Sequence, residues 1–244
     1  MKTNSILIII PAYNEERNIA RVLSDLLARA LDADILVVND GSSDRTREAA
    51  SAFPVTVISH PVNLGYGAAL QTGFHYAKNK GYGYCVQFDA DGQHDASDLP
   101  RMIDAVRQGD ADIVIGSRFL DRTGNMRLGP MKTAAIALFR SLIYRTTGVS
   151  VTDPTSGFKG VAREVFTHYA DQRDFPSDFP DADILIRMLL RRFRIKEIPV
   201  TMRERETGVS MHSGLKPVMY MLKMLLSVLI VLLNDRLARR RGVL

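Results

Sequence analysis

The hydrophobic and polar positions of this 244-residue chain follow two alternating patterns. Short apolar runs, typical of buried strands, are separated by stretches in which apolar residues recur at helical spacing. The predicted strands cover residues 5–10, 34–38, 54–60, 84–88, 113–116 and 195–200, and a polar turn over residues 152–157 leads into residues 158–161. The predicted helices begin after Asn14 and after Asp44, and then cover residues 68–79, 97–108, 131–147, 181–193 and 215–237. Strands that alternate with helices in this way predict an α/β fold with a mostly parallel sheet.

Three of the predicted strands run directly into polar turns. These turns are Tyr13-Asn14-Glu15, Asp40-Gly41-Ser42 and Asp89-Ala90-Asp91. Parallel strands place their carboxyl ends at one edge of the sheet, where ligands of open α/β sheets bind. Asp40 is therefore expected to accept a hydrogen bond from a base or a ribose. The alternatives are that Asp40 caps a helix and that Glu15 complements a helix dipole.

The Asp-x-Asp motif of the third turn predicts a divalent-metal site. Magnesium binds one or two carboxylates and completes its coordination with water and substrate phosphate oxygens. Asp89 and Asp91 supply the carboxylates, Gln93 adds a neutral oxygen, and His94 is a possible donor to a phosphate or leaving group. The alternative is a polar turn in which Gly92 adopts the unusual backbone conformation. The preceding strand and the neighbouring turns favour the metal site.

The charge of the chain is unevenly distributed. The net charge is +5, from 32 Lys+Arg and 27 Asp+Glu, but residues 184–244 carry 13 Lys+Arg and 4 Asp+Glu, a net of +9. A basic end of this kind is expected to face an anionic membrane surface, a lipid phosphate or a nucleic acid. Few aromatic residues are available there for base stacking, so nucleic acid is not expected. The single cysteine, Cys85, lies in a predicted strand and is expected to be a core residue. A chain with one cysteine cannot form an internal disulfide, which indicates a reducing compartment. No secretory signal is expected.

The last predicted helix is strongly apolar, and its uncharged run over residues 224–233 is too short to span a bilayer. Its polar residues fall at spacings that form one narrow stripe: Lys216, Tyr220, Lys223, Ser227 and Asn234. We expect this helix to lie in a membrane interface, with Arg236, Arg239, Arg240 and Arg241 near anionic headgroups. The alternative is a helix that packs on the domain or on a second subunit of a homodimer. The expected domains are residues 1–212 and 213–244.

The chain resembles family 2 glycosyltransferases of the GT-A fold, and within them the dolichyl- and polyprenyl-phosphate sugar synthases. The resemblance covers nearly all of residues 5–212. Its motifs, in order, are Pro11-Ala12-Tyr13-Asn14-Glu15, Asn39-Asp40-Gly41-Ser42-Ser43-Asp44, Asn63-Leu64-Gly65-Tyr66-Gly67, Asp89-Ala90-Asp91-Gly92-Gln93-His94, Gly116-Ser117-Arg118, Ser156-Gly157-Phe158-Lys159 and Arg205-Glu206-Thr207-Gly208-Val209-Ser210. Each motif is weak alone, and their order is specific.

The resemblance implies a role for several residues. Those implied to bind the nucleotide-diphospho-sugar are Pro11, Tyr13, Glu15, Asp40, Gly65, Asp89, Arg203 and Ser210. Those implied to hold Mg2+ or Mn2+ on the diphosphate are Asp89, Asp91 and Gln93. Arg118, Arg203 and Arg205 would meet the donor or acceptor phosphates, and residues 203–212 would close over the site. The implied reaction is direct displacement with inversion at the anomeric carbon.

The acceptor decides whether a general base is needed. A sugar hydroxyl must lose a proton as it attacks and requires a carboxylate base, whereas a lipid phosphate is already ionised and requires cationic contacts. Asp183, with Asp181 as the weaker candidate, stands where many family members carry that base, and both could instead cap a helix. The chain has no pair of clear spanning helices of the kind that the larger polyprenyl-phosphate enzymes carry.

We therefore expect a metal-dependent inverting glycosyltransferase that acts on a polyprenyl phosphate or a lipid-linked glycan. It would be peripheral on the cytoplasmic face of the membrane. The alternative within enzymology is transfer to a sugar hydroxyl of a polysaccharide, with Asp183 as base. The alternative of another class is a catalytically silent, membrane-bound binding subunit.

Overall fold

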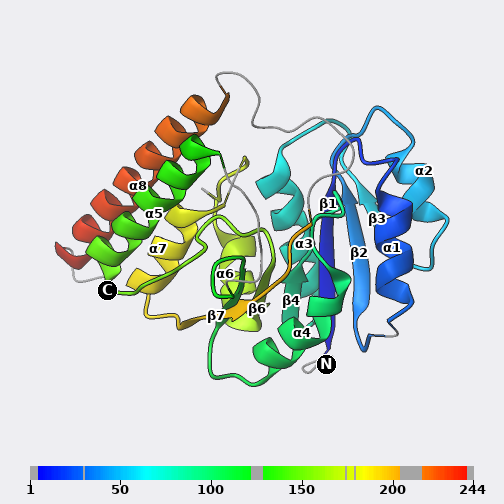
Figure 1. The fold of residues 1–244 in the computed structure, drawn as a ribbon, viewed down its shortest axis with the longest axis horizontal. Coiled ribbons are helices and arrows are strands. Elements are labelled where there is room, and N and C mark those ends of the chain that lie inside the picture. The colour runs from blue at the N-terminus through cyan, green and yellow to red at the C-terminus, as the bar shows by residue number, and fades with distance from the viewer. Residues whose placement is uncertain are drawn as a thin grey trace. The chain divides into compact units, whose positions relative to one another are not determined.

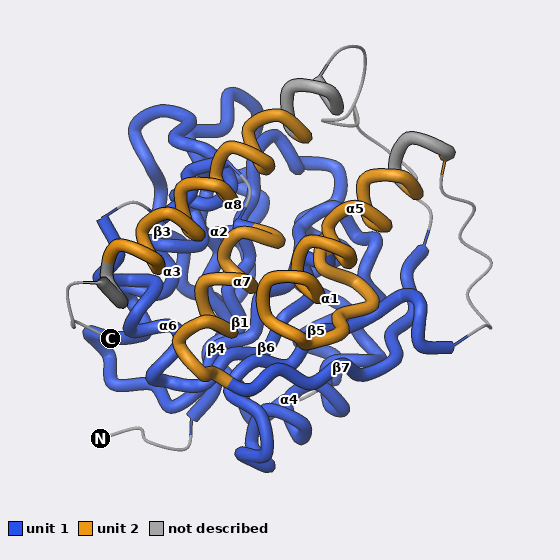
Figure 2. Tube along the Cα trace, turned by 90° about the vertical axis from the view of Figure 1, so that its left-hand side faces the viewer, with its two compact units in different colours: residues 1–126, 156–180, 194–208 blue, residues 127–155, 181–193, 209–244 orange. Residues whose placement is uncertain are grey.

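A computed structural model of the chain describes residues 5–29, 31–121, 129–173, 175–178, 180–203 and 216–240. The chain divides into two compact units, coloured blue and orange in Figure 2. Unit 1 comprises residues 1–126, 156–180 and 194–208, and unit 2 comprises residues 127–155, 181–193 and 209–244. Unit 2 thus joins two internal segments to the C-terminal helix, whereas the sequence suggested one boundary after residue 212.

Unit 1 is built on a seven-stranded sheet with the order β3-β2-β1-β4-β6-β5-β7 (Figure 1). The strands are β1 (Ile6–Ala12), β2 (Asp34–Asn39), β3 (Thr56–Ser59), β4 (Tyr84–Gln87), β5 (Ile113–Ser117), β6 (Lys159–Ala162) and β7 (Ile195–Pro199). All neighbouring strands are parallel except β6, which runs antiparallel to both β4 and β5. The predicted α/β class with a mostly parallel sheet is confirmed. The carboxyl ends of β1, β2, β4 and β5 therefore share one edge.

Helices cover both faces of this sheet. Those of unit 1 are α1 (Ile19–Leu27), α2 (Thr46–Ser51), α3 (Tyr66–Lys80), the short 3-10 helix η1 (Ala96–Asp98), α4 (Leu99–Arg107) and α6 (Arg163–Asp171). One face carries α3 and α6, which contact each other and β4. The apolar residues of α1, α2 and α4 share a core on the other face.

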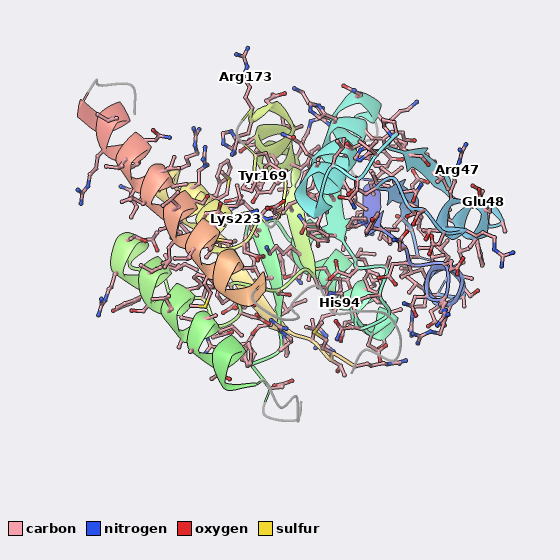
Figure 3. The ribbon with its side chains drawn as sticks, turned by 90° about the horizontal axis from the view of Figure 1, so that it is seen from above. Arg47, Glu48, His94, Tyr169, Arg173 and Lys223 are labelled. Carbon is pink, nitrogen blue, oxygen red and sulfur yellow. The ribbon has the colours of Figure 1, made fainter. Side chains whose placement is uncertain are left out.

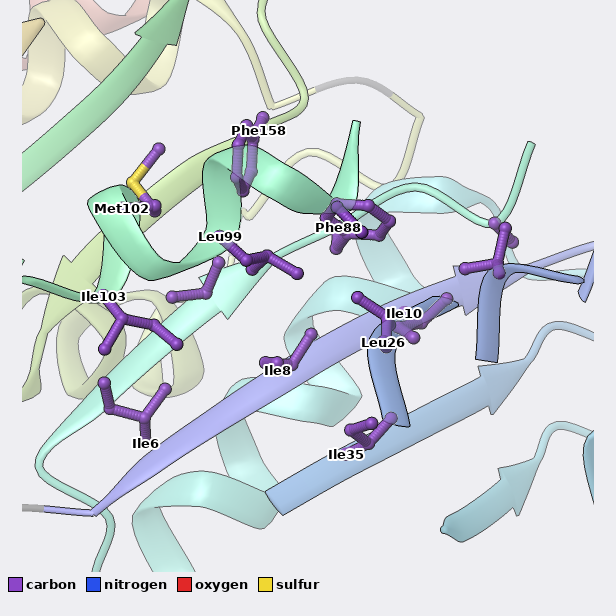
Figure 4. Close-up of a cluster of buried hydrophobic side chains, with 14 of the residues drawn as sticks. Ile6, Ile8, Ile10, Leu26, Ile35, Phe88, Leu99, Met102, Ile103 and Phe158 are labelled. Atoms are coloured by element: carbon purple, nitrogen blue, oxygen red, sulfur yellow. The ribbon is translucent and has the colours of Figure 1, made fainter. Parts of the chain in front are cut away.

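Strand β1, an interior strand of the sheet, is buried along its whole length, as expected for a parallel strand with helices on both sides. Its side chains alternate between the two faces. Ile6, Ile8 and Ile10 join the core that includes Leu99 and Met102 (Figure 4). Ile9 points to the opposite face, where a methyl group on Gly73 of α3 would come within 2.4 Å of it. Helix α3 can therefore approach the sheet closely only because residue 73 has no side chain.

Unit 2 contains α5 (Pro130–Thr147), α7 (Ala182–Leu190) and α8 (Lys216–Arg240), and α7 contacts both of the others. Helix α8 buries Met224, Val228 and Val231, which lie on one face at spacings of four and three residues. Another face of α8 remains exposed although it is apolar. Its residues are Leu222, Leu225, Leu226, Leu229, Ile230, Leu233 and Leu237. Within the described residues, no helix combines the length and apolar character needed to cross a bilayer.

Several predicted boundaries differ from the structure. Helix α1 begins at Ile19, not after Asn14, because Asn14 has a positive φ of 55° and residues 13–18 form turns. The predicted helix 97–108 is divided into η1 and α4, and β1 continues through Pro11 to Ala12. Helix α6 was not predicted. The last loop, residues 203–212, lies almost wholly outside the described residues.

Candidate active site

The turns after β1 and β2 are joined to each other by hydrogen bonds. The Asn14 amide donates to Ser42 Oγ over 3.0 Å, and the Asn14 side-chain oxygen accepts from the Ser43 amide over 2.9 Å. The Glu15 amide donates to Thr46 Oγ1 over 2.8 Å. The left-handed backbone of Asn14 thus lets one residue bind the neighbouring turn through both its amide and its side chain. The predicted convergence of the turns at one sheet edge is confirmed.

Asp40 is buried at the end of β2 and organises the loop before α3. Its Oδ2 accepts from the Gly65 amide over 2.8 Å, and its Oδ1 accepts from the Leu64 amide over 2.9 Å. His60 Nδ1 lies 2.7 Å from the same Oδ1. Gly65 has a φ of 103°, and a side chain there would meet the Ser177 carbonyl oxygen at 2.4 Å. The sequence motif therefore needs glycine at this position for two steric reasons.

Asp89, which follows β4, is held from two sides. Tyr66 Oη donates to its Oδ1 over 2.9 Å, and His94 Nε2 lies 3.0 Å from its Oδ2. Burial alone would raise the pKa of Asp89, but the His94 and Tyr66 hydrogen bonds and the charge of Lys159 outweigh it, so the pKa lies below its usual value. Asp89 therefore stays ionised. His94, labelled in Figure 3, has only 2% of its side chain exposed. Its role as a donor to a phosphate or leaving group stays a prediction.

The rest of the Asp-x-Asp turn is joined to the segment that follows β7. Asp91 Oδ1 accepts from the Gln93 amide over 3.0 Å. The Arg203 amide donates to the Gln93 carbonyl over 2.7 Å, and Arg203 Nη2 bonds Asp95 Oδ2 over 2.8 Å. Although burial opposes ionisation of Asp95, hydrogen bonds from Ser97 and Arg203 lower its pKa to about 2. A backbone hydrogen bond and an ion pair therefore join the turn to the segment that contains Arg203.

The donor set suits a metal that shares its coordination with substrate. Within the described residues, no group of three or more His, Cys, Asp and Glu side chains forms a complete protein site for a metal ion. Asp89 and Asp91 provide two carboxylates separated by one residue, and Gln93 is half-buried beside them. One or two carboxylates with substrate oxygens is the arrangement that magnesium uses in phosphate-transfer sites. The side chains of Asp89, Asp91 and Gln93 therefore suit a magnesium ion.

The other predicted site residues lie around this edge. Pro11 is buried in β1, whereas Tyr13 is 46% exposed. Arg118 follows β5 and its guanidinium lies 5.5 Å from the Phe119 ring centre. Arg203 also lines a cavity of about 180 Å³ with Arg21, Arg29 and His94. Arg205 and Ser210 lie outside the described residues.

Asp183 lies in the first turn of α7 in unit 2, and it is almost fully buried. Its Oδ1 accepts from the Ile184 amide over 2.8 Å, and its Oδ2 accepts from the hydroxyl of Ser227 on α8. Burial raises the pKa of Asp183 despite these two hydrogen bonds, and the nearby Asp181 raises it further. Asp181 occupies the N-cap position of α7, but its side chain makes no capping hydrogen bond there. Asp183 is thus a buried carboxyl that connects two helices.

The seven-stranded sheet and the helices on its two faces define a GT-A type of fold. The family model described as Glycosyl transferase family 2 matches residues 7–170, and the chain belongs to this family.

Among similar proteins, polyprenol monophosphomannose synthase of Mycolicibacterium smegmatis is 34% identical over 223 residues, covering 87% of this chain and 82% of the relative. Undecaprenyl-phosphate mannosyltransferase of Micrococcus luteus is 34% identical over 216 residues, covering 86% and 88%. The crystal structure of glucosyl-3-phosphoglycerate synthase from Mycobacterium tuberculosis with Mn2+ and UDP-glucose has a TM-score of 0.70 at 21% identity, covering 92% and 79%. The structural likeness shows that the fold is shared.

The structure adds residues to the site that the sequence did not single out. Tyr66 and Gly157 contact or crowd Asp89, and His60 contacts Asp40. Tyr66 and Gly157 belong to motifs that the sequence analysis identified, but the sequence assigned neither residue a role. His60 belongs to no motif. Its contact with Asp40 depends on how β2 and β3 pair, which the sequence does not show.

We expect Gly157→Ala to lower kcat/KM by about 10- to 100-fold, because a misplacement of about 1 Å at a reacting site can cost that much. A methyl group at residue 157 would lie 2.4 Å from Asp89 Oδ2 and displace the carboxylate. Steady-state sugar transfer would measure the effect. Gly129→Ala is the control, because a methyl group there meets nothing within 4 Å. Equal activity of the two variants would contradict the crowding of Asp89.

We expect Asp183→Asn to melt a few degrees above the natural protein at pH 8, with a difference that shrinks toward pH 4. The raised pKa means that Asp183 favours folding at low pH, and this contribution is lost as the pH rises through the folded-state pKa. Asparagine keeps an acceptor for Ile184 without the buried charge. Thermal unfolding between pH 4 and pH 8 would measure this, with exposed Asp104→Asn as control. A pH-independent difference would contradict it.

Proposed function

We propose that this protein is an inverting, metal-dependent glycosyltransferase that moves a sugar from a nucleotide-diphospho-sugar to a polyprenyl phosphate. The observation that carries the proposal is the ionised Asp89, held by Tyr66 and His94 where the carboxyl ends of the strands meet. Its support from relatives is that proteins named polyprenol monophosphomannose synthase, undecaprenyl-phosphate mannosyltransferase and dolichol-phosphate mannosyltransferase match most of the chain.

The proposed chemistry assigns charge stabilisation to the turn after β4 and to arginines. Asp89, Asp91 and Gln93 would hold Mg2+ or Mn2+, which neutralises charge on the leaving diphosphate when it is bound. Arg118, Arg203 and Arg205 would bind phosphates, since guanidinium groups pair bidentately with phosphate oxygens. Pro11, Tyr13, Glu15, Asp40, Gly65 and Ser210 would bind the donor. Direct displacement requires no covalent intermediate.

The state of Asp183 supports a phosphate acceptor. A general base must reach the proton that it removes. Asp183 is only 1% exposed, its carboxyl oxygens are engaged by Ile184 and Ser227, and burial raises its pKa toward the neutral form. A phosphate acceptor brings its own negative charge and needs no such base.

The exposed face of α8 supports action at a membrane surface. Seven leucine and isoleucine side chains between residues 222 and 237 are between 36% and 63% exposed. Lys223 lies seven residues before Ile230, at one edge of this face, and Arg236 lies seven residues after Leu229, at the other edge. An apolar face bordered by cations is the pattern of a helix in an anionic membrane interface. We propose that the face rests on the cytoplasmic surface of the membrane.

We expect the purified protein, given membrane extract and a panel of nucleotide-sugars, to form a product that is extractable into organic solvent and labile to mild acid. Transfer should require Mg2+ or Mn2+ and stop with chelator. Asp89→Asn should lower the rate by at least about 100-fold, because it removes a charged ligand of the metal ion that stabilises the leaving diphosphate.

Asp183→Asn separates the possible acceptors in the same assay. It should retain transfer to lipid phosphate within about threefold, whereas loss of a general base would cost about 100-fold or more. Product in the aqueous polysaccharide fraction, with loss of activity in Asp183→Asn, would identify a sugar-hydroxyl acceptor. Undiminished turnover by Asp89→Asn would refute the proposed metal site.

We expect the double variant Leu226→Glu, Leu229→Glu to lose binding to vesicles that contain phosphatidylglycerol, because two charges would enter the apolar face. Natural-protein binding should weaken with salt and with vesicles of phosphatidylcholine alone. Val62→Glu, at a 59% exposed position in unit 1, is the control and should bind as the natural protein does. A concentration-dependent homodimer that only the double variant abolishes would assign the face to a second copy instead.

A further inference from the structure

A chain of hydrogen bonds extends behind Asp40, away from its contacts with the loop before α3. His60 Nδ1 lies 2.7 Å from Asp40 Oδ1, and His60 Nε2 lies 2.9 Å from Thr72 Oγ1. The side chains of His60 and Asp40 are 9% and 4% exposed. The three residues come from the end of β2, the end of β3 and the middle of α3. No sequence motif contains either His60 or Thr72.

The direction of each hydrogen bond follows from what the groups can donate. An ionised carboxylate can only accept, so His60 Nδ1 must carry the proton that it shares with Asp40. In the neutral imidazole, Nε2 is then an acceptor, and the Thr72 hydroxyl donates to it. Thr72 therefore fixes the ring of His60 in the tautomer and orientation that Asp40 requires.

The Asp40 carboxylate is consequently fixed by three donors. Oδ1 accepts from His60 and from the Leu64 amide, and Oδ2 accepts from the Gly65 amide. A carboxylate oxygen can accept about two hydrogen bonds, so Oδ2 retains capacity for one further donor. Rotation of the carboxylate would break contacts on both oxygens. The Asp40 carboxylate thus determines both the direction in which Oδ2 can accept a further hydrogen bond and the backbone path of residues 64 and 65.

The backbone at this turn leaves no room to compensate for a displaced Asp40. A methyl group on Gly41 would meet the Val62 carbonyl carbon at 2.3 Å. The His60 amide also donates to the Asn39 carbonyl over 2.9 Å, which links the end of β3 to the end of β2. Residues 39–41 and 60–65 therefore form one packed unit, whose side-chain connection to α3 is the His60–Thr72 hydrogen bond.

We propose that His60 and Thr72 are positioning residues for the donor nucleotide, acting through Asp40 and the amides of residues 64 and 65. This inference rests on the proposed function, in which Asp40 and Gly65 bind the nucleotide-diphospho-sugar. The nucleoside end of the donor keeps its contacts throughout the displacement at the anomeric carbon. Contacts that are equal in ground state and transition state change KM and not kcat.

The test variant is Thr72→Val, which removes the hydroxyl at nearly constant shape and leaves His60 Nε2 without its donor. The loss of one such hydrogen bond, about 1 kcal/mol, corresponds to about a fivefold change. We expect the Kd of UDP or GDP, whichever binds in the presence of MnCl2, and the KM of the donor to rise about fivefold. The value of kcat should stay within about twofold. Thr72→Ser keeps the hydroxyl and should restore both constants.

His60→Phe provides a second variant, because it preserves an aromatic ring and removes both hydrogen bonds. It should weaken nucleotide binding more than Thr72→Val does, and adding Thr72→Val to it should cause no further loss. This non-additivity is the signature of residues that act in series. Two losses of nucleotide affinity that add would instead show that Thr72 and His60 act on the nucleotide independently.

A control variant separates positioning from general destabilisation. Val106→Ala removes two methyl groups from the fully buried core beside Gly160, and none of the described contacts joins it to Asp40 or His60. It should lower the melting temperature without changing the Kd of UDP or GDP measured by calorimetry. An equal rise of Kd in Val106→Ala, or an unchanged Kd in Thr72→Val, would overturn the inference alone. Absence of nucleotide binding and transfer in the natural protein would overturn the proposed function with it.

Discussion

The retention of negative charge on partly buried carboxylates is the constraint on which this site depends. The parallel sheet brings the turns after β1, β2 and β4 to one edge, and this places acidic side chains where water is partly excluded. Burial alone would favour the neutral acid. At Asp89, donors from α3 and from the following turn, together with Lys159, outweigh that cost. The same donors fix the carboxylate in one orientation, so ionisation and geometry are achieved by one set of contacts.

Hydrogen bonds also hold two neighbouring carboxylates, with different consequences. Asp95 is ionised beside Arg203, which ties the Asp-x-Asp turn to the segment after β7. Asp40 accepts from two backbone amides and from His60, so its carboxylate organises a loop. Both carboxylates act on backbone position as well as on charge. These hydrogen bonds join the turns and loops at this edge of the sheet to one another.

Unit 2 presents the opposite case, because Asp183 is buried where its environment favours the protonated acid. Its partner, Ser227, belongs to α8, and α8 is apolar on two faces. One face contains the buried Met224, Val228 and Val231, and the other exposes a row of leucines. A helix that is apolar on two sides has little net amphipathic character, although each side has a separate role. Within the polar stripe expected from the sequence, Ser227 bonds α7, while Lys223 and Asn234 are exposed.

The sequence by itself determined the α/β class, the approximate positions of six of the seven strands, the polar turns at one sheet edge and the Asp-x-Asp motif. These features follow from local periodicity and from the geometric rule that parallel strands end at the same edge. The sequence did not determine the start of α1. Asn14 and Glu15 form hydrogen bonds with the turn after β2 and do not cap a helix. The sequence also gave no indication of the His60–Asp40 and Ser227–Asp183 contacts, which join residues 20 and 44 positions apart. Only the tertiary structure decided these contacts, because they depend on strand order and helix packing, which are set by the burial of the whole chain and not by any local pattern.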